Sequence, residues 1–573
     1  MMKSEQPLLS LENLSIAFGD APPAVEGLSL TVSRGRTLGI VGESGSGKSL
    51  TSLALMGLLP KTAKLLSGRA LFSPDSKPPV DLLSCGPDAM RKFRGKRIAM
   101  VFQEPMSSLN PLHTCGEQVA ESLRLHEKCG RREAFDRTTA LFEDVELPRP
   151  EAIFNSYPHQ LSGGQKQRVM IAMALSCNPD LLIADEPTTA LDVTVQKHIL
   201  ALLKRLCERN RTGMIFITHD LGVVAETAQD VLVMYRGKAV EYGSVNEIFK
   251  NPAEAYTRAL IDCRPRLDKN PEVLPTVADY MRHADGTTPP PRVETDRKKM
   301  TSADAAVLVD ARDINVWYPT EKNFWGKPTA FLKAVDGVSL QIRKGETMGL
   351  VGESGCGKST LGRALLRLQP IHSGSISYEG RSIEGLSPRE MRPLRRRIQL
   401  IFQDPYGSLN PRMTVEAALT EPMVVHGLVG KDMAAGGKKA SRAARIAALL
   451  DRVGLPASAK NKYPHEFSGG QRQRICIARA LVTEPDFLVC DESVSALDVS
   501  VQAQVLNLLN ELKADLGLTY LFISHDLSVV KYMSDRIAVM RKGKIEEFAE
   551  AETLYKSPAS PYTRTLIEAI PEI

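Results

Sequence analysis

Gly42-Glu43-Ser44-Gly45-Ser46-Gly47-Lys48-Ser49 is the stretch that decides the fold of this chain, and it occurs twice. The second copy, Gly352-Glu353-Ser354-Gly355-Cys356-Gly357-Lys358-Ser359, begins 310 residues later (352 − 42). Each copy follows an apolar run and precedes a helical pattern. Glycines at this spacing let the backbone wrap a phosphate, whose charge then meets N–H groups and a helix N-terminus. The repeat therefore predicts two nucleotide-hydrolysing units joined head to tail.

Short apolar runs surround the first loop. Residues 37–41 feed the loop, residues 49–59 read as a helix, and the runs 181–184 and 214–217 each end at polar residues. Apolar runs that alternate with helical stretches are typical of a parallel sheet, and such sheets hold ligands at the carboxyl ends of their strands. We expect an α/β fold with the site at that edge.

Length and composition set the broad class. The 573 residues fit two domains of about 250 residues each. A net charge of +6 with 43% apolar residues indicates a globular protein, and no apolar run approaches the roughly 18–20 residues of a membrane span. Residues 1–7 hold no apolar stretch of signal-peptide length, and the nine scattered cysteines contain no C-x-x-C pair. We therefore expect a cytosolic setting, neither disulfides nor zinc, and any membrane-crossing parts on other chains.

The repeat also suggests where the domains end. We expect a first domain over residues 8–263, a linker over 264–304 and a second domain over 305–573. The linker contains Pro289-Pro290-Pro291, which interrupts any helix, so it is predicted to be extended and weakly ordered.

Charged residues at fixed positions supply the chemistry. Lys48 and Lys358 are expected to reach the β- and γ-phosphates, and Ser49 and Ser359 to ligate Mg²⁺. The apolar runs 182–184 and 488–490 end in Asp185-Glu186 and Asp491-Glu492. The aspartate of each pair can hold Mg²⁺ through water, and the glutamate can orient and deprotonate the attacking water.

Two further stretches carry a family resemblance. Leu161-Ser162-Gly163-Gly164-Gln165 and Phe467-Ser468-Gly469-Gly470-Gln471 resemble the signature sequences of ATP-binding cassette (ABC) ATPases. The resemblance implies two tandem P-loop NTPase domains, each a RecA-like α/β core with an antiparallel β subdomain and a helical subdomain. It also implies that the loop of one unit shares a nucleotide with the signature of the other, so that Lys48 would work with Ser468 and Lys358 with Ser162.

Other family positions match residue by residue. Gln103 and Gln403 resemble the Q-loop, which touches Mg²⁺ and faces the membrane partner; Asp192 and Asp498 fit the D-loops; His219 and His525 fit the switch histidine. Phe18 and Tyr318 fit the aromatic that stacks on adenine, although Trp317 competes with Tyr318. The implied catalytic residues are Glu186, His219, Glu492 and His525; the implied metal ligands are Ser49, Gln103, Asp185, Ser359, Gln403 and Asp491. The implied ATP contacts are Phe18, Gly42, Ser44, Gly45, Ser46, Gly47, Lys48, Ser49, Leu50, Gln103, Ser162, Gly163, Gly164, Gln165, Tyr318, Gly352, Ser354, Gly355, Cys356, Gly357, Lys358, Ser359, Thr360, Gln403, Ser468, Gly469, Gly470 and Gln471.

Both halves contain the full set of lysine, glutamine, aspartate, glutamate, histidine and signature residues, which predicts two sites that can hydrolyse ATP. Two departures stand in the second half. Ser493 replaces the proline found at Pro187, and Cys356 stands inside the phosphate loop, where alkylation is expected to block ATP binding.

Several stretches resemble one branch of the family, the oligopeptide/dipeptide/nickel importer ATPases, and among these the fused glutathione and microcin-type importers. They are the Q-loop surroundings 102–111 and 402–411, Tyr157-Pro158-His159 and Tyr463-Pro464-His465, and the Pro-Tyr-Thr-x-x-Leu pattern within the C-terminal segments at about 240–265 and 545–573. The first segment has Ala255 where the family has proline. Since Cys263 is the single cysteine shortly after the first of these patterns, which ends at Leu260, no iron–sulfur cluster is expected.

This resemblance implies an ATP-hydrolysing subunit at the cytoplasmic face of a bacterial inner membrane. It implies two permease subunits, a periplasmic or lipid-anchored solute-binding protein, ATP and Mg²⁺, with no nucleic acid and with the cargo left open. The alternative is a soluble tandem ABC ATPase acting on ribosomes or nucleic acid. The proline run and the lack of zinc-binding cysteine pairs count against it. Export is a third possibility, disfavoured because exporters usually fuse their cassettes to membrane spans.

Overall fold

The computed structural model describes residues 6–74, 78–103, 108–188, 191–282, 305–322, 325, 328–428, 438–495 and 497–571. The chain folds into two compact units, and the first unit runs up to Asp262. Residues 263–276 belong with the second unit. Each half is described by itself below. Among the helices in these ranges, none combines the length and apolar character needed to cross a bilayer.

The first half contains an antiparallel sheet with strand order β2-β1-β4-β5. Its strands are β1 (Leu9–Phe18), β2 (Val25–Val32), β4 (Ala63–Phe72) and β5 (Val80–Asp81). Leu28, Leu30 and Val32 alternate with exposed positions along β2, as expected for a strand with one face on the core.

A second sheet of six strands has the order β10-β9-β3-β8-β7-β6. Its strands are β3 (Thr37–Val41), β6 (Ile98–Val101), β7 (Leu181–Asp185), β8 (Gly213–Ile217), β9 (Asp230–Tyr235) and β10 (Lys238–Ser244). All neighbours are parallel except the β9–β10 hairpin. Every residue of β3, β7 and β8 is buried, which explains their continuous apolar sequence.

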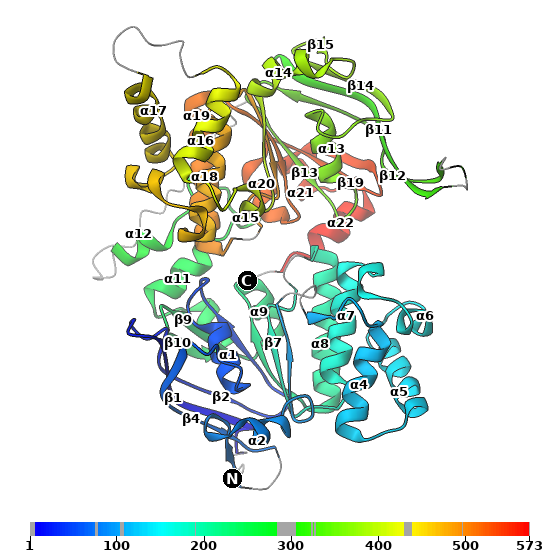
Figure 1. Cartoon of the computed structure of the whole chain (residues 1–573), viewed down its shortest axis with the longest axis vertical. Helices are drawn as coiled ribbons and strands as arrows, with labels where there is room; N and C mark the ends of the chain where they lie inside the picture. The colour runs from blue at the N-terminus through cyan, green and yellow to red at the C-terminus, as the bar shows by residue number, and fades with distance from the viewer. Residues whose placement is uncertain are drawn as a thin grey trace. The chain divides into compact units, whose positions relative to one another are not determined.

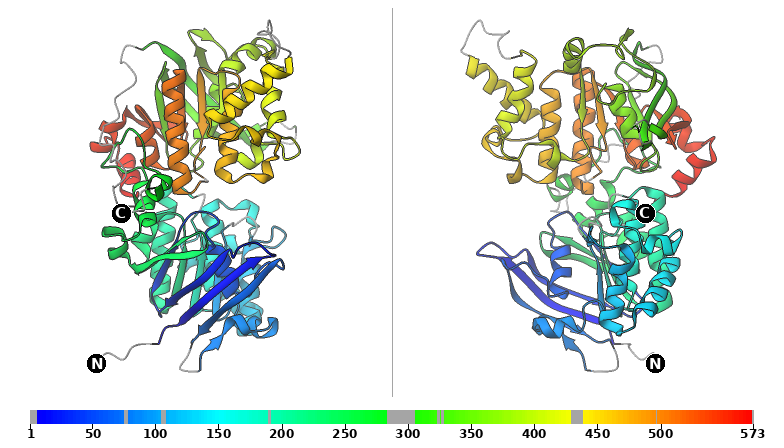
Figure 2. Two further views of the ribbon diagram at one scale, coloured as in Figure 1. Left: turned by 90° about the vertical axis from the view of Figure 1, so that its left-hand side faces the viewer. Right: turned by 45° about the vertical axis from the view of Figure 1, so that its right-hand side comes forward.

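Helices complete the first half. They are α1 (Lys48–Leu55), α2 (Pro87–Arg91), α4 (Cys115–Glu127), α5 (Arg131–Asp144), α6 (Pro150–Phe154), α7 (Gly163–Leu175), α8 (Val193–Asn210), α9 (Leu221–Thr227), α10 (Val245–Lys250), α11 (Ala255–Asp262) and α12 (Val277–Arg282). Within this half, α4 to α6 lie at one end and the antiparallel sheet at the other, with the six-stranded sheet between them (Figures 1 and 2).

The second half repeats this plan. Its antiparallel sheet, in the order β12-β11-β14-β15, contains β11 (Val307–Lys322), β12 (Pro328–Arg343), β14 (Ser373–Tyr378) and β15 (Arg381–Ser382). Its six-stranded sheet, in the order β16-β17-β18-β13-β19-β20, contains β13 (Thr347–Val351), β16 (Ile398–Ile401), β17 (Phe487–Asp491), β18 (Thr519–Ile523), β19 (Arg536–Arg541) and β20 (Lys544–Glu550). The helices are α13 (Lys358–Leu365), α14 (Pro388–Arg397), α15 (Pro405–Ser408), α16 (Val415–Val425), α17 (Lys438–Arg452), α18 (Gly469–Leu481), α19 (Val499–Leu516), α20 (Leu527–Met533), α21 (Ala551–Lys556) and α22 (Pro561–Glu568).

One apolar core in each half joins the two sheets. In the first half it includes Leu14 of the antiparallel sheet together with Ile40 and Ile183 of the six-stranded sheet. In the second half Ile314, Leu350 and Val489 belong to the corresponding core. This shared packing fixes the strand that feeds each phosphate loop.

Part of the predicted linker is better ordered than expected. Leu274 is buried, its N–H donates to Asn507 Oδ1 at 2.9 Å, and Asn507 Nδ2 donates back to Leu274 O at 2.8 Å. The hydroxyl of Tyr532 donates to Glu272 O at 3.2 Å. Side chains of α19 and α20 thus hold residues 263–276 in place. The Asn507 amide satisfies both backbone groups of the buried Leu274, which would otherwise lack hydrogen-bond partners. Residues 283–304, with the proline run, lie outside the described ranges.

Candidate nucleotide-binding sites

Glycines of the two phosphate loops lie very close to neighbouring backbone atoms. Gly42 and Gly352 have φ near 150°, and a Cβ built on either would lie 2.1 Å from the carbonyl oxygen of Met234 or Met540. Gly47 (φ 97°) and Gly357 (φ 110°) cap the helices α1 and α13 that follow. A side chain at these positions would collide with backbone, so the loop shape requires glycine.

Each loop folds around its lysine. Lys48 Nζ donates to Gly42 O at 2.7 Å and to Glu43 O at 2.8 Å. Lys358 Nζ makes the same bonds to Gly352 O and Glu353 O, both at 2.8 Å. Both lysines are buried. Carbonyl oxygens solvate an ammonium group without neutralising it, so each loop offers a positive charge that suits a polyphosphate.

A hydroxyl and a carboxylate meet beside each loop. Ser49 Oγ donates to Asp185 Oδ1 at 3.1 Å, and Ser359 Oγ donates to Asp491 Oδ1 at 2.6 Å. The other oxygen of Asp491 is buried and accepts no hydrogen bond from the residues that the structure describes; the Arg363 guanidinium lies 3.7 Å from it. Burial raises the pKa of both aspartates. Paired hard oxygen donors with an unsatisfied buried oxygen fit a divalent cation such as Mg²⁺.

The glutamate after each aspartate is held by two partners. Gln103 Nε2 donates to Glu186 Oε2 at 3.0 Å, and His219 Nδ1 lies 3.3 Å from Glu186 Oε1. In the second half, Gln403 Nε2 donates to Glu492 Oε2 at 2.7 Å, and His525 Nδ1 lies 3.5 Å from the same oxygen. Both glutamates have positive φ, 47° and 46°. Left-handed backbone at a non-glycine residue is strained and is concentrated at functional sites.

Electrostatics keep the second glutamate ionised. Burial disfavours a charged imidazole, yet the hydrogen bonds and charges of Glu186 and Glu492 outweigh it and raise the pKa of His219 and His525. For Glu492, burial acts to raise the pKa, but the hydrogen bond and charge of His525 lower it overall. A carboxylate that is ionised and hydrogen-bonded is suited to accept a proton from water.

The signature stretches form helix starts. Ser162 Oγ accepts the Gln165 N–H at 3.3 Å and Gln165 Oε1 accepts the Ser162 N–H at 3.0 Å; Ser468 and Gln471 form the same box at 3.4 and 3.1 Å. A Cβ on Gly164 would lie 2.9 Å from Val195 and one on Gly470 2.2 Å from Val501. These glycines therefore keep the helix start close to α8 or α19, whose own first turns are capped by Asp192 and Asp498. Thr189, Ala190, Ala496 and residues 104–107 lie outside the described ranges.

The aromatic candidates differ in their surroundings. Phe18 ends β1 and is 37% exposed. Tyr318 lies on β11 and packs partly against the core of the second half. Trp317 stacks on His372 with ring centroids 4.0 Å apart, and Lys333 lies 4.9 Å from its ring centroid. The indole of Trp317 therefore already packs against His372 and Lys333.

Two tyrosines at the loops were not predicted as site residues. The hydroxyl of Tyr256 accepts the Glu43 N–H at 3.2 Å, and that of Tyr562 accepts the Glu353 N–H at 3.3 Å. Their recurrence 306 residues apart (562 − 256), the same offset as between Glu186 and Glu492, was the signal that could have found them.

Modification of Cys356 is expected to abolish ATP binding at the second loop, but slowly. The thiol is buried, burial raises its pKa, and its sulfur lies 2.9 Å from the position of a Cβ on Gly352. A low thiolate fraction slows alkylation, and an added group has no room inside the loop. Peptide mapping after N-ethylmaleimide treatment, with ATP titration of the modified chain, checks this. A Cys356→Ser control should bind ATP normally after the same treatment; normal binding by chain modified at Cys356 would contradict the expectation.

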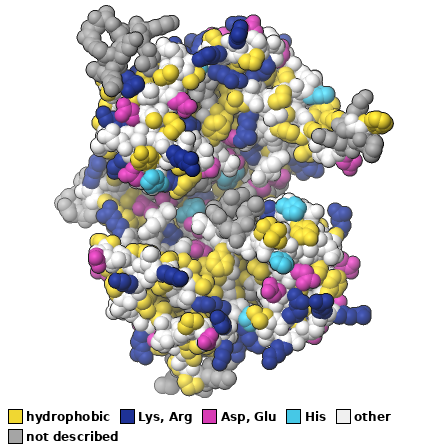
Figure 3. Space-filling model, in the orientation of Figure 1, with side chains coloured by type: hydrophobic (Ala, Val, Ile, Leu, Met, Phe, Trp, Pro, Cys, Tyr) yellow, Lys and Arg dark blue, Asp and Glu magenta, His cyan; other side chains and the backbone are white. Residues whose placement is uncertain are grey.

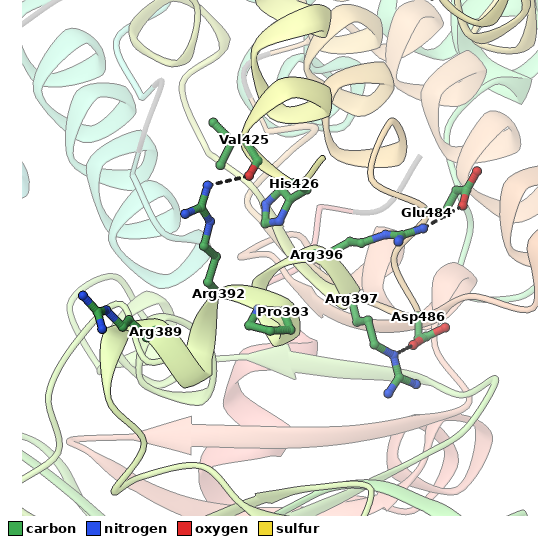
Figure 4. A pocket seen from close by; sticks show the side chains of 9 residues that line it. All are labelled: Arg389, Arg392, Pro393, Arg396, Arg397, Val425, His426, Glu484 and Asp486. Carbon is green, nitrogen blue, oxygen red and sulfur yellow. Dashed lines mark hydrogen bonds and ion pairs between the residues drawn. The ribbon is translucent and has the colours of Figure 1, made fainter. Parts of the chain in front are cut away.

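A separate cavity of about 570 Å³ lies against α14 and is not one of these sites. Its lining includes Arg389, Arg392, Arg396 and Arg397 (Figure 4), and Lys and Arg side chains gather over this part of the surface (Figure 3). Arg396 bonds Glu484 at 3.1 Å, and Arg397 bonds Asp486. The first half repeats the latter pair as Arg97 and Asp180, 3.0 Å apart, so this arginine cluster partly serves structural ion pairs.

Comparison with known proteins adds to this geometry. A family model described as "ABC transporter" matches residues 25–189 and 335–495, and one described as "Oligopeptide/dipeptide transporter, C-terminal region" matches 240–286 and 547–573. The glutathione import ATP-binding proteins GsiA of Shigella boydii serotype 4 (strain Sb227) and Escherichia coli (strain K12) are each 48% identical over 574 residues, covering 98% of this chain and 89% of theirs. A dimeric, post-hydrolysis structure of an ATP-binding cassette bound to ADP and Pi is 26% identical, with a TM-score of 0.38, and is matched over 43% of this chain and 99% of that one.

Proposed function

The chain belongs to the ABC transporter family of ATP-binding proteins, and from that premise we propose that it is the energy-coupling ATPase of a bacterial inner-membrane importer for peptides. The observation that supports this most is the duplicated set of lysine, aspartate, glutamate, glutamine and histidine contacts, present in both halves. We also propose that the first domain ends at residue 263 and that the second begins at residue 305. Residues 263–276, between them, belong with the second unit.

The chain's own groups would bind and orient ATP. The backbone N–H groups of each loop and Lys48 or Lys358 would hold the β- and γ-phosphates, and Phe18 or Tyr318 would stack on adenine. Ser49 with Asp185, and Ser359 with Asp491, would hold Mg²⁺, with Gln103 and Gln403 near it. When bound, the metal would neutralise charge between the phosphates.

Water activation would fall to Glu186 and Glu492. Each carboxylate would accept a proton from the water that attacks the γ-phosphate, since it is placed by a glutamine and a histidine. Once the γ-phosphate is present, His219 and His525 would contact it while keeping the glutamate in place.

The signature residues would complete the nucleotide site of the opposite half, as the family resemblance implies. On this arrangement, Ser468→Arg should weaken ATP binding at the Lys48 loop about tenfold or more, because a bulky cation replaces a hydroxyl donor, and leave the Lys358 loop less affected. The two sites are separated by adding Lys48→Ala or Lys358→Ala to the variant, so that ATP titration reports on the loop that keeps its lysine. Equal loss at both loops would count against the opposite pairing, and Ser162→Arg provides the mirror control.

Membrane partners and the cargo follow from the branch of the family. Apolar side chains are exposed along the segments that follow the Q-loop strands: Phe102, Leu112, Leu125, Phe402, Tyr406 and Val424. We propose that they help to dock two permease subunits, which would keep this chain at the cytoplasmic face and link it to a solute-binding protein. The relatives are named for glutathione import, so glutathione and short peptides are the first cargoes to test.

Co-isolation tests the proposal against the alternative. A tagged full-length chain expressed with the permeases and the solute-binding protein should copurify with both permeases in detergent and hydrolyse ATP faster when the loaded binding protein is added. Copurification with ribosomes or nucleic acid, without permeases, would favour a soluble role instead.

A further inference from the structure

A buried tyrosine touches each phosphate loop from behind. Tyr256 on α11 and Tyr562 on α22 are 2% and 7% exposed. Their hydroxyls accept the N–H of the second loop residue, Glu43 at 3.2 Å and Glu353 at 3.3 Å. Both tyrosines lie in the segments that match the oligopeptide/dipeptide C-terminal region. The same contact in two halves indicates that it is a built feature rather than an accident of packing.

A glutamate fixes the start of each tyrosine-bearing helix. Glu241 on β10 accepts the N–H groups of Ala253 and Glu254 at 2.8 and 3.4 Å. Glu547 on β20 accepts those of Ala559 and Ser560 at 2.8 and 2.9 Å. A carboxylate that satisfies two orphan donors at a helix start holds that end firmly. The tyrosine follows within three residues, so its ring cannot easily shift.

The adjoining hairpin turn supports the same loop. Gly237 donates its N–H to Ser46 O at 3.2 Å, and Gly543 donates to Cys356 O at 3.0 Å. The tyrosine rings are themselves packed, Tyr256 against Tyr235 at 4.3 Å between centroids and Tyr562 under Arg541 at 4.6 Å. The first loop is thus supported by the β9–β10 hairpin and α11. The second loop is supported in the same way by the β19–β20 hairpin and α22.

We propose that Tyr256 and Tyr562 are positioning residues that hold the phosphate loops in their nucleotide-binding shape, and so tie ATP affinity to the C-terminal segments. Each hydroxyl accepts a hydrogen bond from a partly buried loop N–H and so fixes one backbone group of the loop. Without it, the loop must be ordered when the nucleotide arrives, which weakens binding without slowing the chemical step. This role rests on the function proposed above, since the loops must bind ATP.

The test is an ATPγS–Mg²⁺ titration of the full-length chain with one loop disabled. In a Lys358→Ala background, Tyr256→Phe should raise the dissociation constant of the first loop about fivefold, the size of one hydrogen bond, and Tyr562→Phe should not change it. In a Lys48→Ala background the pattern should reverse. Tyr235→Phe is the matched control, because it removes a hydroxyl from the neighbouring ring and spares the bond to the loop.

A second readout separates positioning from simple stability. In the otherwise unaltered chain, Tyr256→Phe combined with Tyr562→Phe should raise KM for ATP with kcat within about twofold, because the chemistry at Glu186 and Glu492 is untouched. Glu241→Gln, which loosens the helix start, should weaken the first loop in the same direction. Unchanged affinity, or an equal loss at both loops from either tyrosine variant, would overturn the proposal. Failure of the parent chains to bind ATPγS at all would count against the proposed function instead.

Discussion

Replacing Glu186 and Glu492 together by glutamine is expected to lower ATP turnover by about 10²–10⁴-fold, the usual contribution of a general base, while ATP binding is preserved. The amide keeps the shape of the side chain and its contacts with Gln103 or Gln403, but it cannot accept a proton from water. Steady-state phosphate release by the purified full-length chain measures the loss.

The single variants sharpen this expectation. Each should retain no more turnover than one working site supplies, and the exposed control Glu208→Gln should match the parent chain. Turnover near the parent level in the double variant would remove both glutamates from the role of base.

Alanine at Lys48 or Lys358 is expected to weaken ATP binding at its own loop about 100-fold or more. The buried ammonium of each lysine is held only 2.7–2.8 Å from loop carbonyls, in the position where a phosphate would meet it. Charge-assisted bonds contribute about 1.5–3 kcal/mol each, and two such bonds to the phosphates account for the loss. Equilibrium titration with radiolabelled ATP measures it.

The control for the lysine variants is Lys64→Ala, a change at an exposed lysine of the first half. It should bind ATP as the parent does. If Lys48→Ala and Lys358→Ala also bound ATP at parent affinity, the glycine loops would not be the phosphate sites, whatever their sequence.

The sequence predicted the family, the fold class and the ATPase activity, and the comparisons confirm all three. It succeeded because fully buried strands such as β3, β7 and β8 have continuous apolar sequences that end at polar residues. Parallel strands align their carboxyl ends, so Asp185 meets Ser49 and Glu186 meets His219 without any further signal. The roles of these residues stay predictions until the variants are measured.

Other features depended on contacts between distant segments. The hydrogen bond from the Glu43 N–H to the Tyr256 hydroxyl spans 213 residues, and it forms only because the β9–β10 hairpin brings α11 back to the loop. Likewise, the proline-rich composition of 264–304 gave no hint that Asn507 would pair with both backbone groups of Leu274. The composition of a segment indicates only how well it is solvated on average. The position of residues 263–276 depends instead on the hydrogen bonds of one amide side chain, that of Asn507.

The central claim is that the chain has two nucleotide sites, one at each phosphate loop. The number of ATP molecules retained by the chain carrying both Glu186→Gln and Glu492→Gln, measured by rapid filtration with saturating ATP and magnesium, tests it most directly. We predict two ATP per chain, falling to about one when Lys48 or Lys358 is also replaced by alanine. One ATP or none per chain before the lysine change would contradict the claim.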